Sequence, residues 1–434
     1  MNWKLTVGLV CIFGVLKKFR PGTPFLTPYL KSPQFKNFTN EQIYGQIYTH
    51  WAYSNLISMI PISLCIDWLR FTPIIILEAL LLSVTWALLI FGHSIFHMQL
   101  MQICIATSAD VAYSSYLYSV VSKSKYKRVT SLIRMATMTG KFAAYSFGQF
   151  LVSTEIGDYL LLNQITLGVL FVSLLISLFL PMTTPKRNKK TNKESKQMEQ
   201  ILPSSTDEKH NNLLNKEDQQ ENKKIIESFE LLEGTRKDST RTYREIFLYK
   251  FLRHYRNVNV LCWSIFAILT TCGIFLVMNY EQSLWAHRKV DKSLVWNGFV
   301  EGLNTILSAI CLTFLQFIQI KWEDYRPFVF IGSSLGFSLL LFGMIYFANI
   351  FADYILYINQ IATNMHSDAY GLVFGINNFV TILSITLFTF FFVDKNGPLN
   401  LGIEQMFITF SIFFLSISVI FALMELAVRY FQRK

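Results

Sequence analysis

Long apolar runs separated by short polar breaks fill the first 182 residues. They predict helices over roughly 3–30, 43–66, 74–91, 97–121, 129–152 and 160–180. A run of about twenty apolar residues crosses the bilayer core as a helix, which satisfies its own backbone hydrogen bonds. Pro21, Pro24 and Pro28 interrupt the first run, so we expect that segment to bend and line a cavity.

Polar and charged residues replace this pattern between residues 183 and 256, where 17 Lys/Arg and 12 Asp/Glu gather. Such a segment buries too little apolar surface to fold by itself, so no regular structure is predicted for most of it. Its end differs, because aromatic residues recur every four positions beside basic ones in TRTYREIFLYKFLRHYR. This end is predicted to be either a helix lying in the membrane interface or an extension of the next span.

Apolar runs return over 260–279, 294–317, from Pro327 onward, 372–393 and 401–426. Only about 44 residues separate Pro327 from Gly371, whereas two crossings of about 20 residues and a turn need more. The tenth span is therefore predicted to be short or truncated. The fold class is an all-α polytopic membrane protein with about 11–12 transmembrane helices in two six-helix bundles. The predicted domains are 1–182 (N-terminal bundle), 183–256 (charged cytoplasmic loop), 257–428 (C-terminal bundle) and 429–434 (cytoplasmic tail).

Composition supports this class, since 52% of residues are hydrophobic and only 15% are charged. The net charge of +11 would suit a nucleic-acid partner, but the basic residues concentrate in loops rather than on one surface. We therefore interpret them as a topology signal, with the lipid bilayer as partner and no nucleic acid. The basic segments after the fourth, sixth and last spans all follow even-numbered crossings, which places them and both termini in the cytoplasm.

This orientation puts the loop after the first span outside the cell. The loop holds Asn37-Phe38-Thr39, an N-glycosylation sequon. We therefore expect glycosylation at Asn37.

Motifs for enzyme chemistry are absent from the sequence. It contains no phosphate-binding glycine loop, no H-E-x-x-H and no nucleophile elbow, and its seven histidines do not cluster. The six cysteines lie in apolar runs without metal-ligand spacing, which predicts buried thiols. We expect neither an enzyme nor a bound metal or cofactor.

Ionisable residues inside the apolar runs are the candidate functional groups, because each costs about 3 kcal/mol or more to insert. In the fourth span, Asp110 shares a helix face with Thr107 and Ser114 and lies near Tyr113. The acid could bind a cation or an amino-pyrimidine edge, or it could form a salt bridge to Arg134 that locks two spans together.

Arg134 and Lys141 are seven residues apart, so they lie on one face of the fifth span. Two cations there suit an anionic substrate, although Lys141 could instead extend toward the membrane interface. Glu301 is a further site candidate, and Glu78 fits a structural partner. Asp67 and Arg70 flank a short cytoplasmic turn, which suits a latch between elements.

The chain carries a series of motifs in this order: FRPGTPFLTPYL, KNFT, DWLRFTP, FGHSIFHMQLMQ, AYSSYLYSVV, YKRVTSLIRMAT, FGQFLVS, WNGFVEGLNT, IKW and YGLVFGIN. In these motifs and their order the chain resembles, along nearly its whole length, the reduced folate and thiamine carrier family of the major facilitator superfamily. The resemblance implies a two-bundle fold of major facilitator type, uptake of a water-soluble vitamin at the plasma membrane, anion exchange or proton-linked drive, and no cofactor.

The resemblance also implies roles for single residues. Arg134 falls on the family's functional arginine of the fifth span. Asp110 falls where thiamine carriers have Glu and folate carriers have Arg. Ile385 falls where folate carriers have a substrate-contacting Lys.

Three further positions, Trp51, Tyr113 and Asn297, resemble residues of the thiamine site. Thr23 departs from the pattern, because the family usually has Glu after FRP in the first span. The largely missing tenth span is the second departure, since in folate carriers this span holds an important Arg.

Three functional hypotheses follow. The first is alternating-access uptake of thiamine or a related vitamin, with Asp110 and Glu301 holding positive groups. The second is a folate-type anion carrier in which Lys141 supplies a second cation. The third is a transport-inactive relative that binds a ligand or partner without moving it.

Overall fold

A computed structural model describes residues 3–68, 71–108, 126–180, 258–288, 295–317, 325–362 and 371–433, and these form helices joined by short connections without any strand. The long helices of the first half are α1 (Trp3–Lys18), α4 (Thr49–Trp68), α5 (Phe71–Phe91), α6 (Ile95–Thr107), α8 (Tyr126–Ser153) and α9 (Tyr159–Leu178). Those of the second half are α13 (Val258–Arg288), α14 (Asn297–Phe317), α15 (Ser333–Phe347), α16 (Ile350–Ala362), α17 (Gly371–Phe388) and α18 (Ile403–Arg433). Residues 1–185 and 264–434 form one compact unit and 186–263 a second.

The predicted spans therefore appear as helices, and the all-α class is confirmed. Five helices are long and apolar enough to cross a membrane by length and composition: 72–91, 159–178, 260–288, 328–347 and 403–427. The long helices α4, α8 and α14 miss that criterion. Helices α8 and α14, which pack on one another, are amphipathic and carry polar residues on one face, whereas α4, which packs on α17, has no such face.

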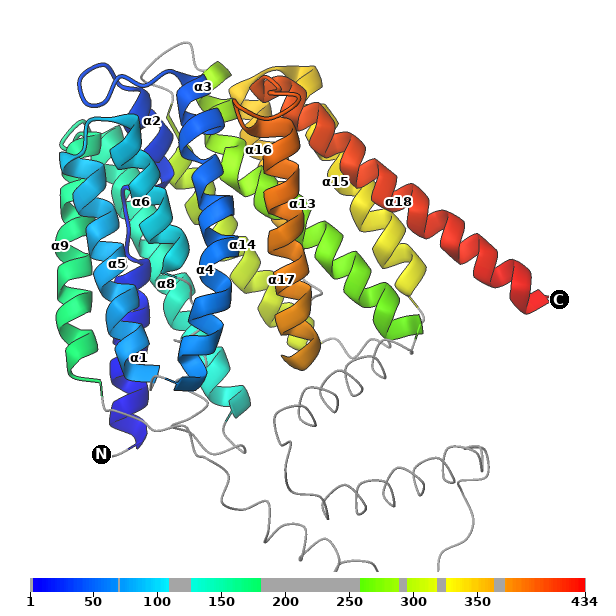
Figure 1. Cartoon of the computed structure of the whole chain (residues 1–434), viewed down its shortest axis with the longest axis horizontal. Coiled ribbons are helices and arrows are strands. Elements are labelled where there is room, and N and C mark those ends of the chain that lie inside the picture. Colours follow the sequence, from blue (N-terminus) through cyan, green and yellow to red (C-terminus); the bar gives the residue numbers. More distant parts are fainter. Residues whose placement is uncertain are drawn as a thin grey trace, which may run out of the picture. The chain divides into compact units, whose positions relative to one another are not determined.

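In the first half, α1 packs against α8 and α9, while α5 packs against α6 and α9 (Figure 1). Gly140 lets α8 approach α1, because a Cβ there would lie 2.5 Å from the carbonyl oxygen of Val15. An ion pair between Lys17 of α1 and Glu78 of α5 is buried beside this contact. Glu78 thus has the structural role expected of it.

The first predicted span is broken, as its prolines indicate. Helix α1 ends at Lys18, and the chain resumes with the 3-10 turn η1 (Thr23–Phe25) and the short helix α2 (Leu26–Lys31). A further short helix, α3 (Asn40–Gln42), leads through a π-helical turn, η2 (Ile43–Ile47), into α4. The segments α2 and α3 lie at the end of the unit opposite the N-terminus (Figure 1).

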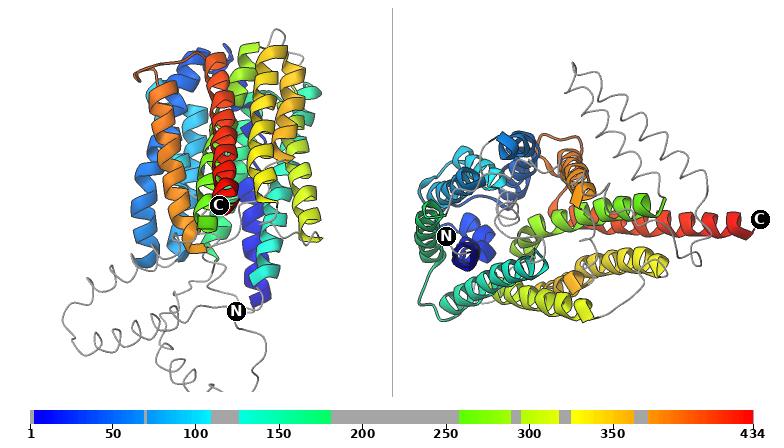
Figure 2. Two further views of the ribbon diagram at one scale, coloured as in Figure 1. Left: turned by 90° about the vertical axis from the view of Figure 1, so that its right-hand side faces the viewer. Right: turned by 90° about the horizontal axis from the view of Figure 1, so that it is seen from below.

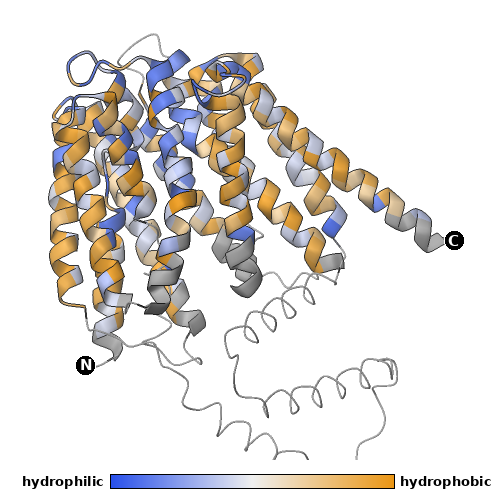
Figure 3. Cartoon of the chain, in the orientation of Figure 1, coloured by the Kyte–Doolittle hydropathy of each residue, from blue (hydrophilic) through white to orange (hydrophobic). Residues whose placement is uncertain are grey.

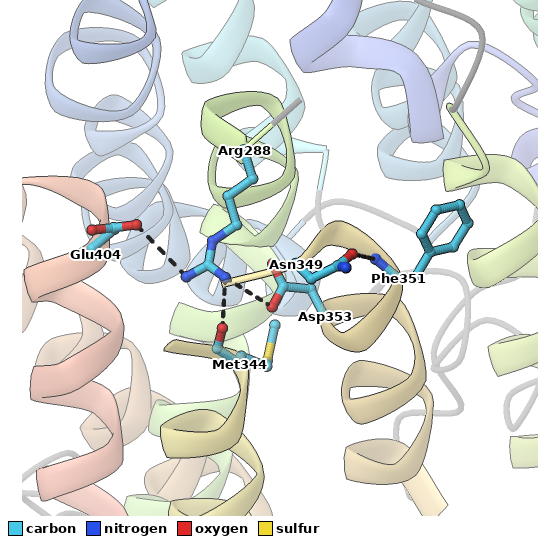
Figure 4. A network of polar contacts seen from close by, with 6 residues as sticks. All are labelled: Arg288, Met344, Asn349, Phe351, Asp353 and Glu404. Atoms are coloured by element: carbon cyan, nitrogen blue, oxygen red, sulfur yellow. Dashed lines mark hydrogen bonds and ion pairs between the residues drawn. The ribbon is translucent and has the colours of Figure 1, made fainter. Parts of the chain in front are cut away.

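In the second half, Arg288 at the end of α13 contacts residues of α15, α16 and α18 (Figure 4). Lys31 of α2 donates to the carbonyl of Ala286 close by. The Arg288 guanidinium donates to the carbonyl of Met344 in α15 at 2.7 Å. It also pairs with Asp353 of α16 at 3.4 Å and with Glu404 of α18 at 3.7 Å. The side chains of Arg288 and Asp353 are almost fully buried, whereas that of Glu404 is half exposed. The arginine therefore fixes the α15–α16 turn.

Two helices have 13 residues each. Helix α6, Ile95–Thr107, covers the start of the predicted span over 97–121, and residues 109–121 lie outside the described ones. Helix α16 has 13 residues, about 20 Å, which agrees with the prediction of a short tenth span. Another π-helical turn, η6 (Thr389–Val393), continues α17, and a third, η5 (Phe328–Gly332), precedes α15.

Large apolar side chains remain exposed along the outer helices. Phe171, Leu175 and Phe179 on and after α9 are each more than half exposed, as is Ile412 of α18. The helices run side by side (Figure 2), and α5 and α9 are hydrophobic along most of their length (Figure 3). An apolar exterior of this extent fits contact with lipid chains.

Candidate functional site

The broken first helix provides hydrogen-bond acceptors for the second half of the chain. Gln282 of α13 donates from Nε2 to the carbonyl of Thr23 at 3.2 Å, and its Oε1 accepts from the Thr27 backbone N–H at 3.4 Å. Asn297 of α14 donates to the carbonyl of Pro24 at 3.0 Å. Pro28 has no N–H to donate to the Pro24 carbonyl, so this carbonyl can accept from a side chain of the second half, and the Thr23 carbonyl accepts there as well.

Helices α8 and α14 meet closely next to this contact. Gln149 of α8 donates to the carbonyl of Val295 at 2.9 Å and accepts from the Phe299 backbone N–H at 3.2 Å. Gly298 permits the approach, since a Cβ there would lie 2.9 Å from the carbonyl oxygen of Tyr145. One side-chain amide therefore holds the start of α14 against α8.

Two acids lie at this interface. Glu301 of α14 accepts a hydrogen bond from the Tyr357 hydroxyl at 3.1 Å and interacts electrostatically with Lys141 of α8. Glu281 of α13 is 2% exposed, and its Oε2 has no hydrogen-bond partner among the described residues. The two carboxylates also act on one another electrostatically. Like charges at a buried position are costly, so this arrangement favours a positive group nearby.

Aromatic rings lie close to Glu301 and at the contact between the halves. Trp285 of α13 makes edge contacts with Tyr354 and Tyr357 of α16 at centroid distances of 4.9 and 5.2 Å. Trp51 of α4 stacks on Phe275 of α13 at 6.2 Å, joining the two halves. Ring faces beside carboxylates attract organic cations.

The end of the unit that carries α2 and α3 is closed by bonds between the halves. Tyr53 of α4 donates to Asp394 Oδ2 at 2.5 Å, and the backbone N–H of Lys395 donates to the carbonyl of Gly45 at 3.1 Å. A cavity of about 220 Å³ remains there. It is lined by Gly45, Gln46, Thr49, His50, Gln99, Asp394, Lys395 and Asn396.

The segment between α2 and α3 contains the sequon. Asn37 is exposed and has a φ of 57°, a conformation that Asn tolerates. Its neighbour Lys36 is buried and donates to the carbonyls of Ile90 at 2.9 Å and Gly92 at 2.5 Å. Burial lowers the pKa of Lys36 from its ordinary value. Lys36 thus anchors the loop while Asn37 stays accessible.

The predicted site residues divide into two groups. Those the structure brings to the interface between the halves are Trp51, Lys141, Asn297 and Glu301. The amide of Asn297 is engaged, because its Oδ1 accepts from the Tyr354 hydroxyl at 2.6 Å while its Nδ2 bonds to Pro24. Arg134 is exposed on α8 and lies on the same helix face as Lys141, two turns away.

Most of the other predicted site residues lie where the structure gives no description of their side chains. Asp110 and Tyr113, with Arg70 of the predicted latch, lie outside the described residues, and the side chain of Asp67 is likewise not described. Ile385 is buried within α17.

Sequence reasoning missed Glu281 and Gln282. Both belong to MNYEQSLW, at the end of an apolar run. An acid in that position was a signal of the same kind as Glu301, but the predicted seventh span stopped at Asn279, so the pair fell into a loop. Helix α13 continues to Arg288 and brings both residues to the interface.

Metal chemistry has no support in the part of the chain that the structure describes. There, no three His, Cys, Asp or Glu side chains are grouped to hold a metal ion. Cys104, Cys262 and Cys272 are buried thiols, as predicted, whereas Cys11 and Cys311 are partly exposed.

Comparison with known families matches residues 1–409 to the reduced folate carrier. The chain belongs to the reduced folate carrier family. It is 34% identical to folate transporter 1 of Caenorhabditis elegans over 97% of this chain and 92% of that protein. It is 33% identical to thiamine transporter 1 of Homo sapiens, over 96% of this chain and 89% of the relative. This carrier family consists of membrane transporters rather than enzymes, so the chain is a multi-pass membrane transporter.

Solved structures agree with the fold of the carrier family. A POT family peptide transporter, PepTSo, superposes with a TM-score of 0.64 at 14% identity, covering 100% of this chain and 99% of that one. The xylose transporter XylE from E. coli superposes with a TM-score of 0.58 at 11% identity, covering 97% and 95%. The chain therefore has the major facilitator fold.

Proposed function

We propose that this transporter takes up thiamine or a related cationic vitamin by alternating access at the plasma membrane. The observation that carries the proposal is the acidic, aromatic interface between the halves, where Glu301 lies among tyrosine and tryptophan rings. A carboxylate with ring faces suits a positively charged heteroaromatic ligand. The human relative named a thiamine transporter supports the same class.

In this proposal, Trp51 contacts the substrate ring, Glu301 and Asp110 hold positive or amino groups, and Arg134 balances charge. Asn297 positions the start of α14. Both termini lie in the cytoplasm, and Asn37 lies outside the cell. The closed end around Tyr53 then represents the extracellular gate.

A folate-type anion carrier is the second candidate. Arg134 and Lys141 share one stripe of α8, which suits an anion, and the relative from Caenorhabditis elegans is named a folate transporter. The neutral residue Ile385 weakens this candidate, because the family resemblance puts a substrate-contacting Lys of folate carriers at that position.

Uptake of labelled thiamine and labelled folate in cells that express the chain separates these candidates. We expect saturable thiamine uptake that falls about 10-fold or more in Glu301→Gln, since a charge-assisted contact is lost. Asp110→Ala should act in the same direction. Saturable folate uptake that thiamine does not inhibit, and that Lys141→Ala weakens, would establish the anion carrier instead.

Absence of both uptakes in a chain that reaches the plasma membrane would identify a transport-inactive relative. Surface biotinylation, with Glu155→Gln as an exposed matched control, shows whether each variant reaches the membrane.

A further inference from the structure

Glu281 lies among side chains from both halves of the transporter. Trp285, one helical turn after Glu281, contacts the ring of Tyr357 at a centroid distance of 5.2 Å, and the Tyr357 hydroxyl donates to Glu301. The next residue, Gln282, donates to the Thr23 carbonyl of the broken first helix at 3.2 Å. Glu281 therefore lies at the contact between the halves, on the same side of α13 as the partner of Glu301.

The Glu281 carboxylate is buried with fewer hydrogen-bond donors around it than its two oxygens can accept from. Its Oε2 has no hydrogen-bond partner among the described residues, and Glu301 is a like charge. The nearby cations interact electrostatically with other groups: Lys141 with Glu301, and Arg20 with Tyr145. Removing an ionised carboxylate from water without a partner is strongly unfavourable, so the pair favours uptake of either a proton or a positive group.

We propose that Glu281 and Glu301 form one diacid site that binds a single positive charge, the cationic group of an organic substrate. This inference rests on the proposed function for the class of substrate. When the substrate leaves, a proton from water takes its place on a carboxylate oxygen, and that proton returns to water when the next cation binds. Lys141 offsets one acid, so the second acid carries the charge that selects a cation.

The test is thiamine binding to the purified full-length carrier in lipid nanodiscs, measured by calorimetry between about pH 5 and pH 8. Wild-type affinity should rise with pH, because protons compete with the cation. Glu281→Gln should bind thiamine about 10-fold to 100-fold more weakly at the upper end and lose the pH dependence. Glu281→Asp should keep that dependence, and Glu155→Gln should match wild type. Wild-type affinity and pH dependence in Glu281→Gln would overturn the inference.

Infrared difference spectra give a readout that needs no substrate. The empty carrier should show the carbonyl stretch of a protonated carboxylic acid, which Glu281→Gln removes and Glu155→Gln keeps. Presence of the same stretch at full intensity in Glu281→Gln would refute the shared proton site. If thiamine fails to bind at all, the proposed function fails, while the spectra still decide whether the diacid holds a proton.

Discussion

The bond between Tyr53 and Asp394 offers a direct test of the closed end. It joins α4 to the turn that follows η6, and the Lys395–Gly45 backbone bond lies beside it. Tyr53→Phe removes only the hydroxyl, so the ring keeps its packing. The variant should therefore weaken closure without disturbing either half.

The magnitude follows from the type of bond. A hydrogen bond to a charged acceptor contributes about 1.5–3 kcal/mol. Both residues are half-buried, so water can replace part of the interaction when the end opens, and the lower figure applies. A loss of about 1.5 kcal/mol multiplies the open-to-closed ratio by about 10.

Labelling of a cysteine introduced at Thr49 measures this ratio, because Thr49 is buried and lines the cavity at the closed end. A membrane-impermeant thiol reagent should label it about 10-fold faster in Tyr53→Phe. Tyr346→Phe is the matched control, since Tyr346 is exposed on α15. An unchanged rate in Tyr53→Phe, or the same increase in Tyr346→Phe, would refute the assigned role of this bond.

Three other variants test the fold. Arg288→Met should lower the free energy of unfolding by about 3 kcal/mol, because it leaves Asp353 buried without its cation. Thermal unfolding in detergent measures this loss. A double variant that also carries Asp353→Leu should recover most of the loss, and no recovery would contradict the pairing. Gly298→Ala should lower the free energy of unfolding by about 1–3 kcal/mol in the same assay, because the added Cβ would meet the α8 backbone. Gly168→Ala is the control and should lower it little, because Gly168 has open space around it. Equal losses in the two variants would show that the close approach at Gly298 is not needed. Asn37→Gln should abolish a glycosidase-sensitive shift in electrophoretic mobility, and a shift that persists would place the glycan elsewhere.

Much of the fold could be predicted from the local pattern. Apolar length fixes which segments can cross a bilayer, and the prolines near residue 24 indicate a broken helix, because both depend on nearest neighbours along the chain. The short tenth span follows from counting residues before α17. The ends of helices were harder to predict, as α13 shows by continuing to Arg288, because caps and side-chain bonds decide where a helix ends.

What the sequence determined by itself was the class of the chain, the order of its spans and a few of the buried charges, such as Glu78, since each is a property of residues close together in the chain. The tertiary structure decided which of those charges meet. Glu281 and Glu301 are 20 residues apart on different helices, and Tyr357, which bonds Glu301, lies on a third. Only packing of α13, α14 and α16 against α8 and the broken first helix assembles them, because electrostatic partners are chosen by distance in space.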